Sequence, residues 1–273
     1  MICNASTSLG ELKRHNDDGG ESRGTSTAMK VAEIHGRKGH ILYDADPQAN
    51  FDPRWFDQQH LQQANMLTGT APGRGSALFF QNNNHAYVLR HYLRGGLIGK
   101  AIHDRYLWTG LSRTRPWQEW HLLMRLQQLG LPAPKPFAAR AIQHHGSYTA
   151  DLMTHTLPDS HPLADFLNQA PLPHDIWRNI GTVIRQFHDH NVCHADLNAR
   201  NILLGPAHTV FLIDFDKSSI RTPHARWKAN NLNRLQRSLE KFKTHSPDFH
   251  FTTANWSILN HGYQQSTPEC KHD

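Results

Sequence analysis

Four polar residues in the C-terminal half of the chain have the types and spacing that phosphoryl transfer requires. His194, Asp196 and Asn201 form the pattern H-x-D-L-x-x-x-N, and Asp214 follows thirteen residues after Asn201. An aspartate such as Asp196 can accept the proton of a hydroxyl group and orient the attacking oxygen. Amide and carboxylate oxygens, such as those of Asn201 and Asp214, are ligands that Mg²⁺ prefers, and Mg²⁺ neutralises phosphate charge.

The elements around these residues are predicted to bring them to one place. Two apolar runs, residues 202–204 and 210–213, follow Asn201 and are separated by the turn-forming residues 205–208. This pattern predicts a β-hairpin. A loop with one Asp and one Asn would therefore enter the hairpin, and a second Asp would follow its second strand.

The whole segment resembles the catalytic and metal-binding loops of the protein-kinase-like superfamily. The departures from that pattern narrow the family, because Ala195 replaces the Arg of H-R-D, Asp216 replaces the Gly of D-F-G, and no A-P-E motif follows. With VLRHYLRGGLIGK at residues 88–100 and NLNRLQRSL at residues 231–239, the chain is similar to the lipopolysaccharide kinase family over about residues 30–245. Within that family it most resembles the 3-deoxy-D-manno-octulosonic acid (Kdo) kinases.

This resemblance implies an α+β, bilobal protein-kinase-like fold, with a β-rich N-lobe and a helical C-lobe. The N-lobe would span residues 28–153 and hold the phosphate cover and the αC helix. The C-lobe, residues 154–273, would hold the catalytic and metal-binding loops. Residues 1–27 are rich in Ser, Thr, Gly and Asn, and we expect them to form a disordered tail.

The helical pattern of the C-lobe gives three further expectations. Asp175 is placed to cap a helix that begins at the apolar residue Ile176. Residues 223–243 predict an amphipathic, basic helix. Residues 246–273 show no strong pattern, and we expect them to be weakly organised.

Two parts of the N-lobe are expected to meet the phosphates of ATP. Residues 69–76 are rich in glycine and lie next to predicted strands, and Gly73 and Gly75 would let backbone N–H groups approach phosphates. Arg90 stands where the kinase pattern has a Lys, and its guanidinium would hold the α- and β-phosphates. The alternative is that Arg90 is an ordinary strand residue and that Lys100 supplies the charge.

Two further residues complete the expected nucleotide site. A helix is predicted from Pro116 to Gly130, and Glu119 on it would pair with Arg90, as the αC glutamate does in kinases. Alternatively, Glu119 is an exposed residue of the first turn that merely favours the helix dipole. Met153 falls at the expected hinge between the lobes, whose backbone binds adenine in kinases.

The resemblance also implies the reaction. It points to ATP and Mg²⁺ as cofactors and to the 4-hydroxyl of Kdo in Kdo-lipid IVA as the phosphoryl acceptor. It places the enzyme peripherally at the cytoplasmic face of the inner membrane, and no protein partner is inferred. Two alternatives remain open: another small-molecule kinase, such as an aminoglycoside-type phosphotransferase, and a catalytically weak pseudokinase that only binds. Retention of Asp196, Asn201 and Asp214 together favours an active enzyme.

The composition favours acidic ligands. The motifs and residue spacing argue against a nucleic-acid-binding protein and against a histidine metal site. The net charge is +6 and the pI is about 9.3, which suits nucleotides, phospholipids or nucleic acid. No nucleic-acid-binding motif is found, so nucleic acid is not expected as a partner. His188, His190 and His194 do not share one helical face, which argues against a histidine metal site. Three widely spaced cysteines suit a reducing compartment.

Membrane binding is expected without a membrane span. There is no signal-peptide pattern, and no apolar run is long enough to cross a bilayer. Residues 90–115 carry six basic residues and one acidic residue, and Arg94, Lys100 and Arg105 alternate with aromatic and aliphatic residues. We expect this segment to dock on the anionic inner-membrane surface, with the basic helix over residues 223–243 as the next candidate. The alternative is an ordinary solvated connection.

Overall fold

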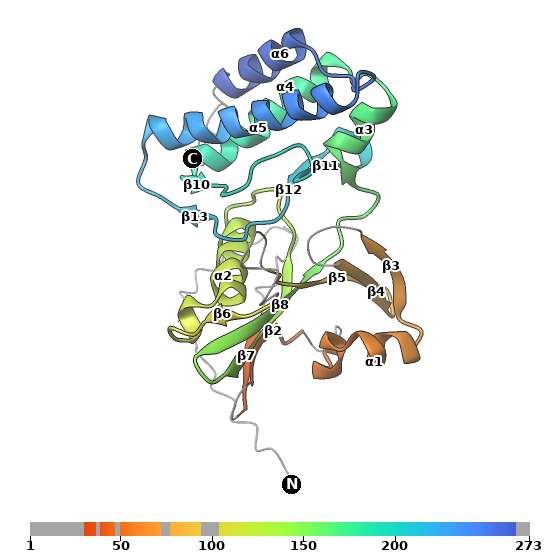
Figure 1. Cartoon of the computed structure of the whole chain (residues 1–273), viewed down its shortest axis with the longest axis vertical. Coiled ribbons are helices and arrows are strands. Elements are labelled where there is room, and N and C mark those ends of the chain that lie inside the picture. Colours follow the sequence, from red (N-terminus) through yellow and green to blue (C-terminus); the bar gives the residue numbers. More distant parts are fainter. Residues whose placement is uncertain (1–29, 37–38, 47–49, 72–76, 94–103, 266–273) are drawn as a thin grey trace, which may run out of the picture. The chain divides into compact units, whose positions relative to one another are not determined.

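The computed structural model describes residues 30–36, 39–46, 50–71, 77–93 and 104–265 of the 273-residue chain. These residues form two compact units (Figure 1). The sheet unit consists of the described residues up to Thr114 together with Phe137–Met153. The helical unit consists of Arg115–Pro136 together with the described residues from Thr154 onward. The predicted mixed α/β class, with a β-rich N-terminal part and a helical C-terminal part, is confirmed.

An eight-stranded sheet with the order β1-β2-β7-β8-β5-β4-β3 forms the sheet unit, with β6 pairing with β8 off this path. Its neighbouring strands with a recorded register are antiparallel, which is why short turns suffice to join them. Three hairpins, β1/β2, β4/β5 and β7/β8, lie within this sheet. The strands are β1 Val31–His35, β2 Gly39–Asp44, β3 Leu67–Ala71, β4 Ala77–Asn82, β5 His85–His91, β6 Tyr106–Leu107, β7 Pro136–His144 and β8 Ser147–His155.

Alternation along β4 and β5 decides which side chains enter the core and which do not. Phe80 pairs with Tyr87 and Ala77 pairs with Arg90 across the two strands. Tyr87 and Leu89 are buried. Because successive side chains of a strand point to opposite faces, Arg90 lies on the face opposite to Leu89, away from this core.

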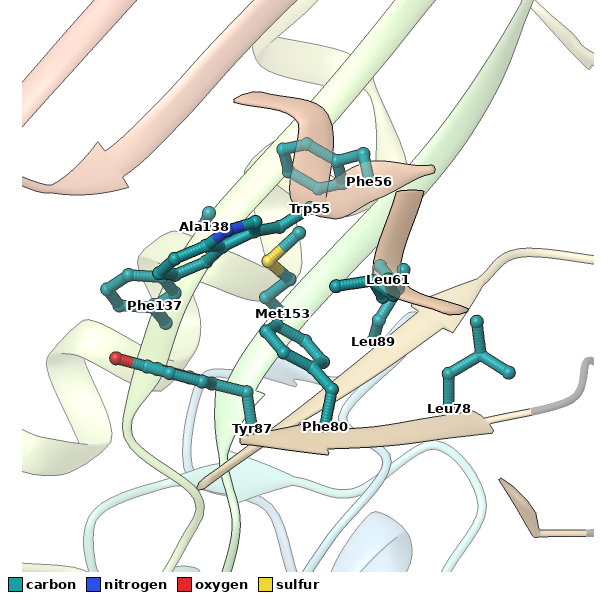
Figure 2. Packing of buried hydrophobic residues seen from close by; sticks show 10 residues of the cluster. All are labelled: Trp55, Phe56, Leu61, Leu78, Phe80, Tyr87, Leu89, Phe137, Ala138 and Met153. Carbon is teal, nitrogen blue, oxygen red and sulfur yellow. The ribbon is translucent and has the colours of Figure 1, made fainter. Parts of the chain in front are cut away.

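The core of the sheet unit lies between the sheet and two short helices, η1 (Pro53–Phe56) and α1 (Gln58–Gln63). Figure 2 shows this cluster, in which the Tyr87 ring packs on Phe137 with centroids 4.4 Å apart. Met153 belongs to the cluster and is fully buried. The complete set is Trp55, Phe56, Leu61, Leu78, Phe80, Tyr87, Leu89, Phe137, Ala138 and Met153.

A buried carboxylate joins three strands of the sheet. Asp151 on β8 is 3% exposed. It accepts from Arg140 Nε on β7 at 2.8 Å and contacts His91 Nδ1 on β5 at 2.7 Å. This hydrogen bond raises the pKa of His91. Both oxygens of the carboxylate are therefore satisfied, which offsets the cost of burying its charge.

The helical unit contains five α-helices and the strands that frame the candidate site in the part of the chain that the structure describes. Its helices are α2 Arg115–Gln128, α3 Leu163–Gln169, α4 His174–Asp189, α5 Ala225–His245 and α6 Thr253–Gln264. Its short strands are β9 His161–Pro162, β10 Val192–Cys193, β11 Ile202–Leu204, β12 Val210–Leu212 and β13 Ser219–Ile220. The 3-10 helices η3 (Leu111–Arg113, in the sheet unit) and η4 (Pro206–His208) complete the described elements.

Two glycines let α4 and α6 approach closely. A Cβ on Gly181 of α4 would overlap the Leu259 carbonyl oxygen, and one on Gly262 of α6 would overlap the Arg178 carbonyl oxygen. Thr252 and Asn255 form a capping box at the start of α6. The expectation that residues 246–273 are weakly organised is therefore wrong over α6. The helix was missed because its contact surface is glycine backbone rather than an apolar stripe.

Asp175 does not cap α4. The helix begins at His174, its N-cap is Pro173, and Asp175 lies in the first turn, where its charge still suits the helix dipole. The helix predicted over residues 223–243 is confirmed as α5. Within the described residues, no helix combines the length and apolar character needed to cross a membrane.

Candidate active site

The loop between β10 and β11 carries Asp196 and Asn201, and its own amide side chains close it. Asn201 Nδ2 donates to the Asp196 carbonyl at 2.9 Å, and Asn198 Nδ2 donates to the same carbonyl at 3.0 Å. Asn198 Oδ1 in turn accepts from the backbone N–H groups of Arg200 and Asn201 at 2.8 and 3.2 Å. The backbone around Asp196 is therefore held by hydrogen bonds from inside the loop.

The hairpin predicted after Asn201 is present and brings Asp214 to the same end. Strands β11 and β12 pair antiparallel, with Ile202 opposite Leu212. Beyond this pair, the Ile213 N–H donates to the Asn201 carbonyl at 3.0 Å. Asp214 is the next residue and has a left-handed φ of 63°, which is uncommon for a non-glycine residue and turns the chain sharply. Asn201 and Asp214 are thus neighbours across the end of the hairpin.

His194 joins the catalytic loop to the strand that precedes Asp214. Its ring is 3% exposed, and Nε2 lies 3.0 Å from the Ile213 carbonyl oxygen. The Asp196 backbone N–H donates to Nδ1 at 3.1 Å. The ring must therefore be neutral, with its proton on Nε2, and burial lowers the pKa of His194 in keeping with this. One side chain sets the distance between the two loops.

The residues after Asp214 anchor this segment to α2. Phe215 is 1% exposed and stacks on Phe187 of α4 with centroids 5.7 Å apart. Arg115, the first residue of α2, donates from Nη1 to Asp216 Oδ2 at 3.0 Å. Asp216, for which the sequence suggested no role, therefore ties this loop to the helix that carries Glu119.

Helix α5 holds the catalytic loop from outside, a role that the sequence reasoning did not assign. Asn231 is 6% exposed, accepts from the His194 N–H at 3.1 Å and donates to the His194 carbonyl at 2.9 Å. Ser238 Oγ accepts from the Ala199 N–H at 3.3 Å. Arg234 donates to Asp196 Oδ1 from Nε at 2.8 Å and from Nη2 at 2.5 Å.

The spacing of these three α5 residues in the sequence indicates that they lie together on one side of the helix. Residues 231, 234 and 238 fall at i, i+3 and i+7, which is one face of a helix. They lie inside the stretch NLNRLQRSL, which was singled out only for its family resemblance.

The segment after Asp216 also packs against the catalytic loop. Strand β13 pairs antiparallel with β10, with Cys193 opposite Ser219. The Ala195 N–H donates to Ser218 Oγ at 2.9 Å. Ala195 is the residue that replaces the usual Arg, and at this position its backbone rather than a side chain contacts the segment.

The residues predicted to bind the nucleotide are placed as follows. Gly73, Gly75 and the alternative base Lys100 lie outside the described residues. Arg90 in the sheet unit donates to the Tyr92 hydroxyl at 3.4 Å, and its guanidinium carbon lies 4.9 Å from the centre of the Tyr92 ring. Met153 directs its side chain into the core (Figure 2), and the contact of its backbone with adenine stays a prediction.

Glu119 on α2 is 3% exposed and lies beyond the first turn. The alternative in which it is an exposed first-turn residue is therefore wrong. Its pairing with Arg90 stays a prediction.

The oxygens of Asn201 and Asp214 fit a divalent cation. Because Asn201 Nδ2 is engaged by the Asp196 carbonyl, its Oδ1 is the atom left to bind a cation. No group of three or more His, Cys, Asp or Glu residues that could hold a metal occurs among the described residues. Mg²⁺ is usually bound by one or two protein oxygens together with substrate phosphates and water, and Asn201 and Asp214 could supply such oxygens.

A histidine metal site is excluded by the contacts of the rings. His188 Nδ1 lies 2.8 Å from the Tyr263 hydroxyl and Nε2 lies 3.3 Å from Asn231 Oδ1. Both ring nitrogens of His194 are also engaged, as described above. Neither ring has a nitrogen left for a metal ion.

Comparisons with known proteins agree with this geometry. The model of the lipopolysaccharide kinase (Kdo/WaaP) family matches residues 58–263. The 3-deoxy-D-manno-octulosonic acid kinase of Photobacterium profundum is 43% identical over 82% of this chain and 92% of its own length. The enzyme of the same name from Haemophilus influenzae strain 86-028NP is 40% identical over 83% of this chain and 96% of its own.

Among solved structures, a likeness is found with the Cydia pomonella granulovirus kinase PK-1. The TM-score is 0.38 and the identity 16%, over 62% of this chain and 58% of that one. This overlap is too small to carry an argument about fold or function.

Proposed function

The chain belongs to the lipopolysaccharide kinase (Kdo/WaaP) family, and from this premise we propose that it phosphorylates the 4-hydroxyl of Kdo in Kdo-lipid IVA with ATP. Relatives that carry the name Kdo kinase support a phosphotransferase that acts on a hydroxyl group of a Kdo-containing acceptor. The single observation that carries the chemistry is the loop that holds Asp196 beside Asn201 and Asp214, in a geometry fixed by His194.

Asp196 is the residue that handles the acceptor proton. Its Oδ1 is held by Arg234, whereas Oδ2 has no partner among the described residues. Oδ2 takes the proton of the acceptor hydroxyl as the hydroxyl oxygen bonds to the γ-phosphorus of ATP. The bond between the γ-phosphorus and the β–γ bridging oxygen breaks, and its electron pair leaves on ADP. The products are a phosphomonoester and ADP, and the proton passes from Asp196 to water.

Mg²⁺ would be held by Asn201 and Asp214, and when bound it would neutralise charge on the phosphates. The chain's own contribution is to keep those two oxygens together, through the backbone hydrogen bond between Ile213 and Asn201. The ion pair of Arg115 with Asp216 fixes the loop on its other side.

On the nucleotide side, we assign the phosphate contact to Arg90 and the adenine contact to the Met153 backbone. Arg90 projects from the face of β5 opposite to the core, so it does not contribute to core packing. Glu119 would orient Arg90, and the segment with Gly73 and Gly75 would cover the phosphates.

The acceptor would be met at the cytoplasmic face of the inner membrane. Of the segment assigned to docking, Arg94 and Lys100 lie outside the described residues. Arg105 is described, and Leu107, two residues further along the chain, is 70% exposed, which suits an interfacial position. Arg115 is paired with Asp216, so we remove it from the docking surface.

The proposed function is tested by direct phosphoryl transfer. Purified protein is incubated with γ-labelled ATP, Mg²⁺ and Kdo-lipid IVA, and the label is followed into the lipid. The expected result is a labelled Kdo-lipid IVA whose phosphate maps to the 4-hydroxyl. Label in an aminoglycoside but not in the lipid would overturn the acceptor, and nucleotide binding without any transfer would support the pseudokinase alternative.

A further inference from the structure

In the contact between Arg234 and Asp196, one carboxylate oxygen receives two donors from the same guanidinium. Nε and Nη2 of Arg234 both approach Oδ1, at 2.8 and 2.5 Å. The side chains are 49% and 47% exposed. A charged group from a distant helix is thus held against the residue that takes the acceptor proton, at a point that solvent and substrate can reach.

This ion pair is not needed to hold the fold together. Half-exposed ion pairs contribute little to stability, because water screens them and two long side chains must be ordered. The attachment of α5 to the catalytic loop is already made by Asn231, which is buried and makes two hydrogen bonds to the His194 backbone. Ser238 adds a third contact at Ala199. These contacts fix the backbone from which Arg234 projects, so its position beside Asp196 is set in advance.

The arrangement leaves one donor edge and one acceptor atom available side by side. Nη1 of Arg234 and Oδ2 of Asp196 have no partner in the described part of the chain. Oδ2 is the atom to which the acceptor hydroxyl must come. Nη1, on the neighbouring guanidinium, offers N–H donors and a permanent positive charge to whatever group lies next to that hydroxyl.

We propose that Arg234 binds the carboxylate of the sugar acid and so holds the acceptor hydroxyl toward Asp196. This inference rests on the proposed function, since it takes a Kdo-containing acceptor. The carboxylate of this acid is attached to C2 of the sugar ring and the acceptor hydroxyl to C4, so a single residue pair can contact both groups. Arg234 touches the substrate and Asp196 together, and it makes the active site selective for an acidic sugar over a neutral one.

The test compares variants of Arg234 with chemical variants of the acceptor. Kdo-lipid IVA and its Kdo methyl ester, which keeps the hydroxyl but lacks the negative charge, are assayed with the parent, Arg234→Ala and Arg234→Lys. Arg237→Ala is the matched control, because Arg237 is exposed on the same helix and has no partner in the described residues. Thermal unfolding of each variant shows that the protein is folded.

We expect the parent to use the ester about 10- to 100-fold less efficiently than the acid, chiefly through a higher KM, which is the scale of one charge-assisted contact. Arg234→Ala should lose a similar factor on the acid and should no longer distinguish acid from ester. Arg234→Lys should recover part of the acid preference, and Arg237→Ala should behave like the parent.

Other outcomes separate this inference from the proposed function. If the parent labels both acceptors equally well, the enzyme is a Kdo kinase that does not read the carboxylate, and only the inference fails. If Arg234→Ala loses the same factor on acid and ester, Arg234 positions Asp196 alone, and the inference also fails. If the parent labels neither lipid, the proposed function itself fails.

Discussion

At the scale of single residues, the site depends on side chains that hold backbone rather than on side chains that react. His194 connects the Asp196 N–H to the Ile213 carbonyl, and Asn201 connects its own side chain to the Asp196 carbonyl. These contacts position the two carboxylates to which we assign the chemistry, Asp196 as proton acceptor and Asp214 as metal ligand. Replacement of either carboxylate by an amide should therefore change the reaction while leaving the fold of the loop intact.

Replacement of Asp196 by Asn removes the proton acceptor but keeps the shape of the side chain. We expect the transfer rate to fall by at least ~10²-fold, the usual scale for a positioned base, with ATP affinity nearly unchanged. Single-turnover transfer and nucleotide titration measure the two quantities. The control is Asp175→Asn on α4, where the side chain is 65% exposed. This variant should keep the parent's transfer rate and ATP affinity. Turnover like the parent in Asp196→Asn would remove Asp196 from its role.

Replacement of Asp214 by Asn has a different signature, because it removes a proposed metal ligand. The Mg²⁺ concentration for half-maximal rate should rise, since an amide oxygen binds a divalent cation more weakly than a carboxylate. Asp196→Asn is the internal control, and its residual rate should keep the parent's Mg²⁺ dependence. An identical Mg²⁺ titration for Asp214→Asn and the parent would contradict the metal assignment.

At the scale of elements, α4 packs against both the candidate site and the C-terminal helix α6. Its buried face carries Phe187, which stacks on Phe215 next to Asp214, and His188, which contacts Asn231 of α5. It also packs on α6, where Gly181 meets the backbone of that helix. A change on the α6 side should therefore reach the site only through the stability of α4.

Gly181→Ala places a methyl group where the Leu259 carbonyl and the Tyr263 N–H already lie. Backbone cannot move aside as a flexible side chain can, so we expect a loss of more than ~2 kcal/mol in the free energy of unfolding. Denaturant unfolding measures it. Gly146→Ala is the matched control, since a Cβ at Gly146 meets no atom within 4 Å. Equal midpoints for the two variants would show that α6 does not pack on α4 in this way.

The elements that the sequence predicted are those whose signal is local. The hairpin after Asn201 follows from apolar runs and turn residues within a few positions. The ion pair of Arg115 with Asp216 joins residues 101 positions apart and leaves no local pattern. Helix α5 has several polar faces, and only the folded chain determines which of them packs against the loop that carries Asp196. Sequence periodicity alone does not decide that question.

At the scale of the whole molecule, the histidine-rich composition makes stability depend on pH. His188 is 1% exposed, and burial lowers its pKa to about 4 from an ordinary value of 6.5. Between pH 6.5 and pH 4, the unfolded chain therefore binds a proton at His188 that the folded chain does not bind. The free energy of unfolding falls as pH drops over this range. The shift corresponds to about 3 kcal/mol at most. His91 opposes this trend, because its pKa is raised and its contribution is fully present at low pH.

We expect the parent's unfolding midpoint to decrease between pH 6.5 and pH 4. His188→Asn, which cannot titrate, should be less stable at pH 7.5 and should lose less on acidification than the parent does. His190→Asn is the control, because His190 is exposed and lies two residues further along the chain. This variant should show the same change of unfolding midpoint with pH as the parent. A parent-like slope in His188→Asn would assign the acid sensitivity to other groups, His194 first among them.

Membrane association also belongs to the whole molecule. Reversing Arg94, Lys100 and Arg105 to Glu should weaken sedimentation with anionic vesicles and raise the KM for the lipid acceptor, with ATP affinity little changed. The α5 residues Arg226, Lys228 and Lys241 reversed to Glu form the comparison set. If the second set weakens sedimentation and the first does not, α5 is the docking surface.

The pairing of β13 with β10 has a consequence for how such an enzyme is controlled. In many kinases, a phosphate group added after synthesis meets an arginine beside the catalytic aspartate and orders the segment that follows the metal-binding loop. Here that segment is ordered by main-chain hydrogen bonds and by Ser218, opposite an alanine. Its order arises as the chain folds and requires no later signal. We therefore expect an enzyme that is permanently switched on, whose output in the cell follows the supply of acceptor and ATP.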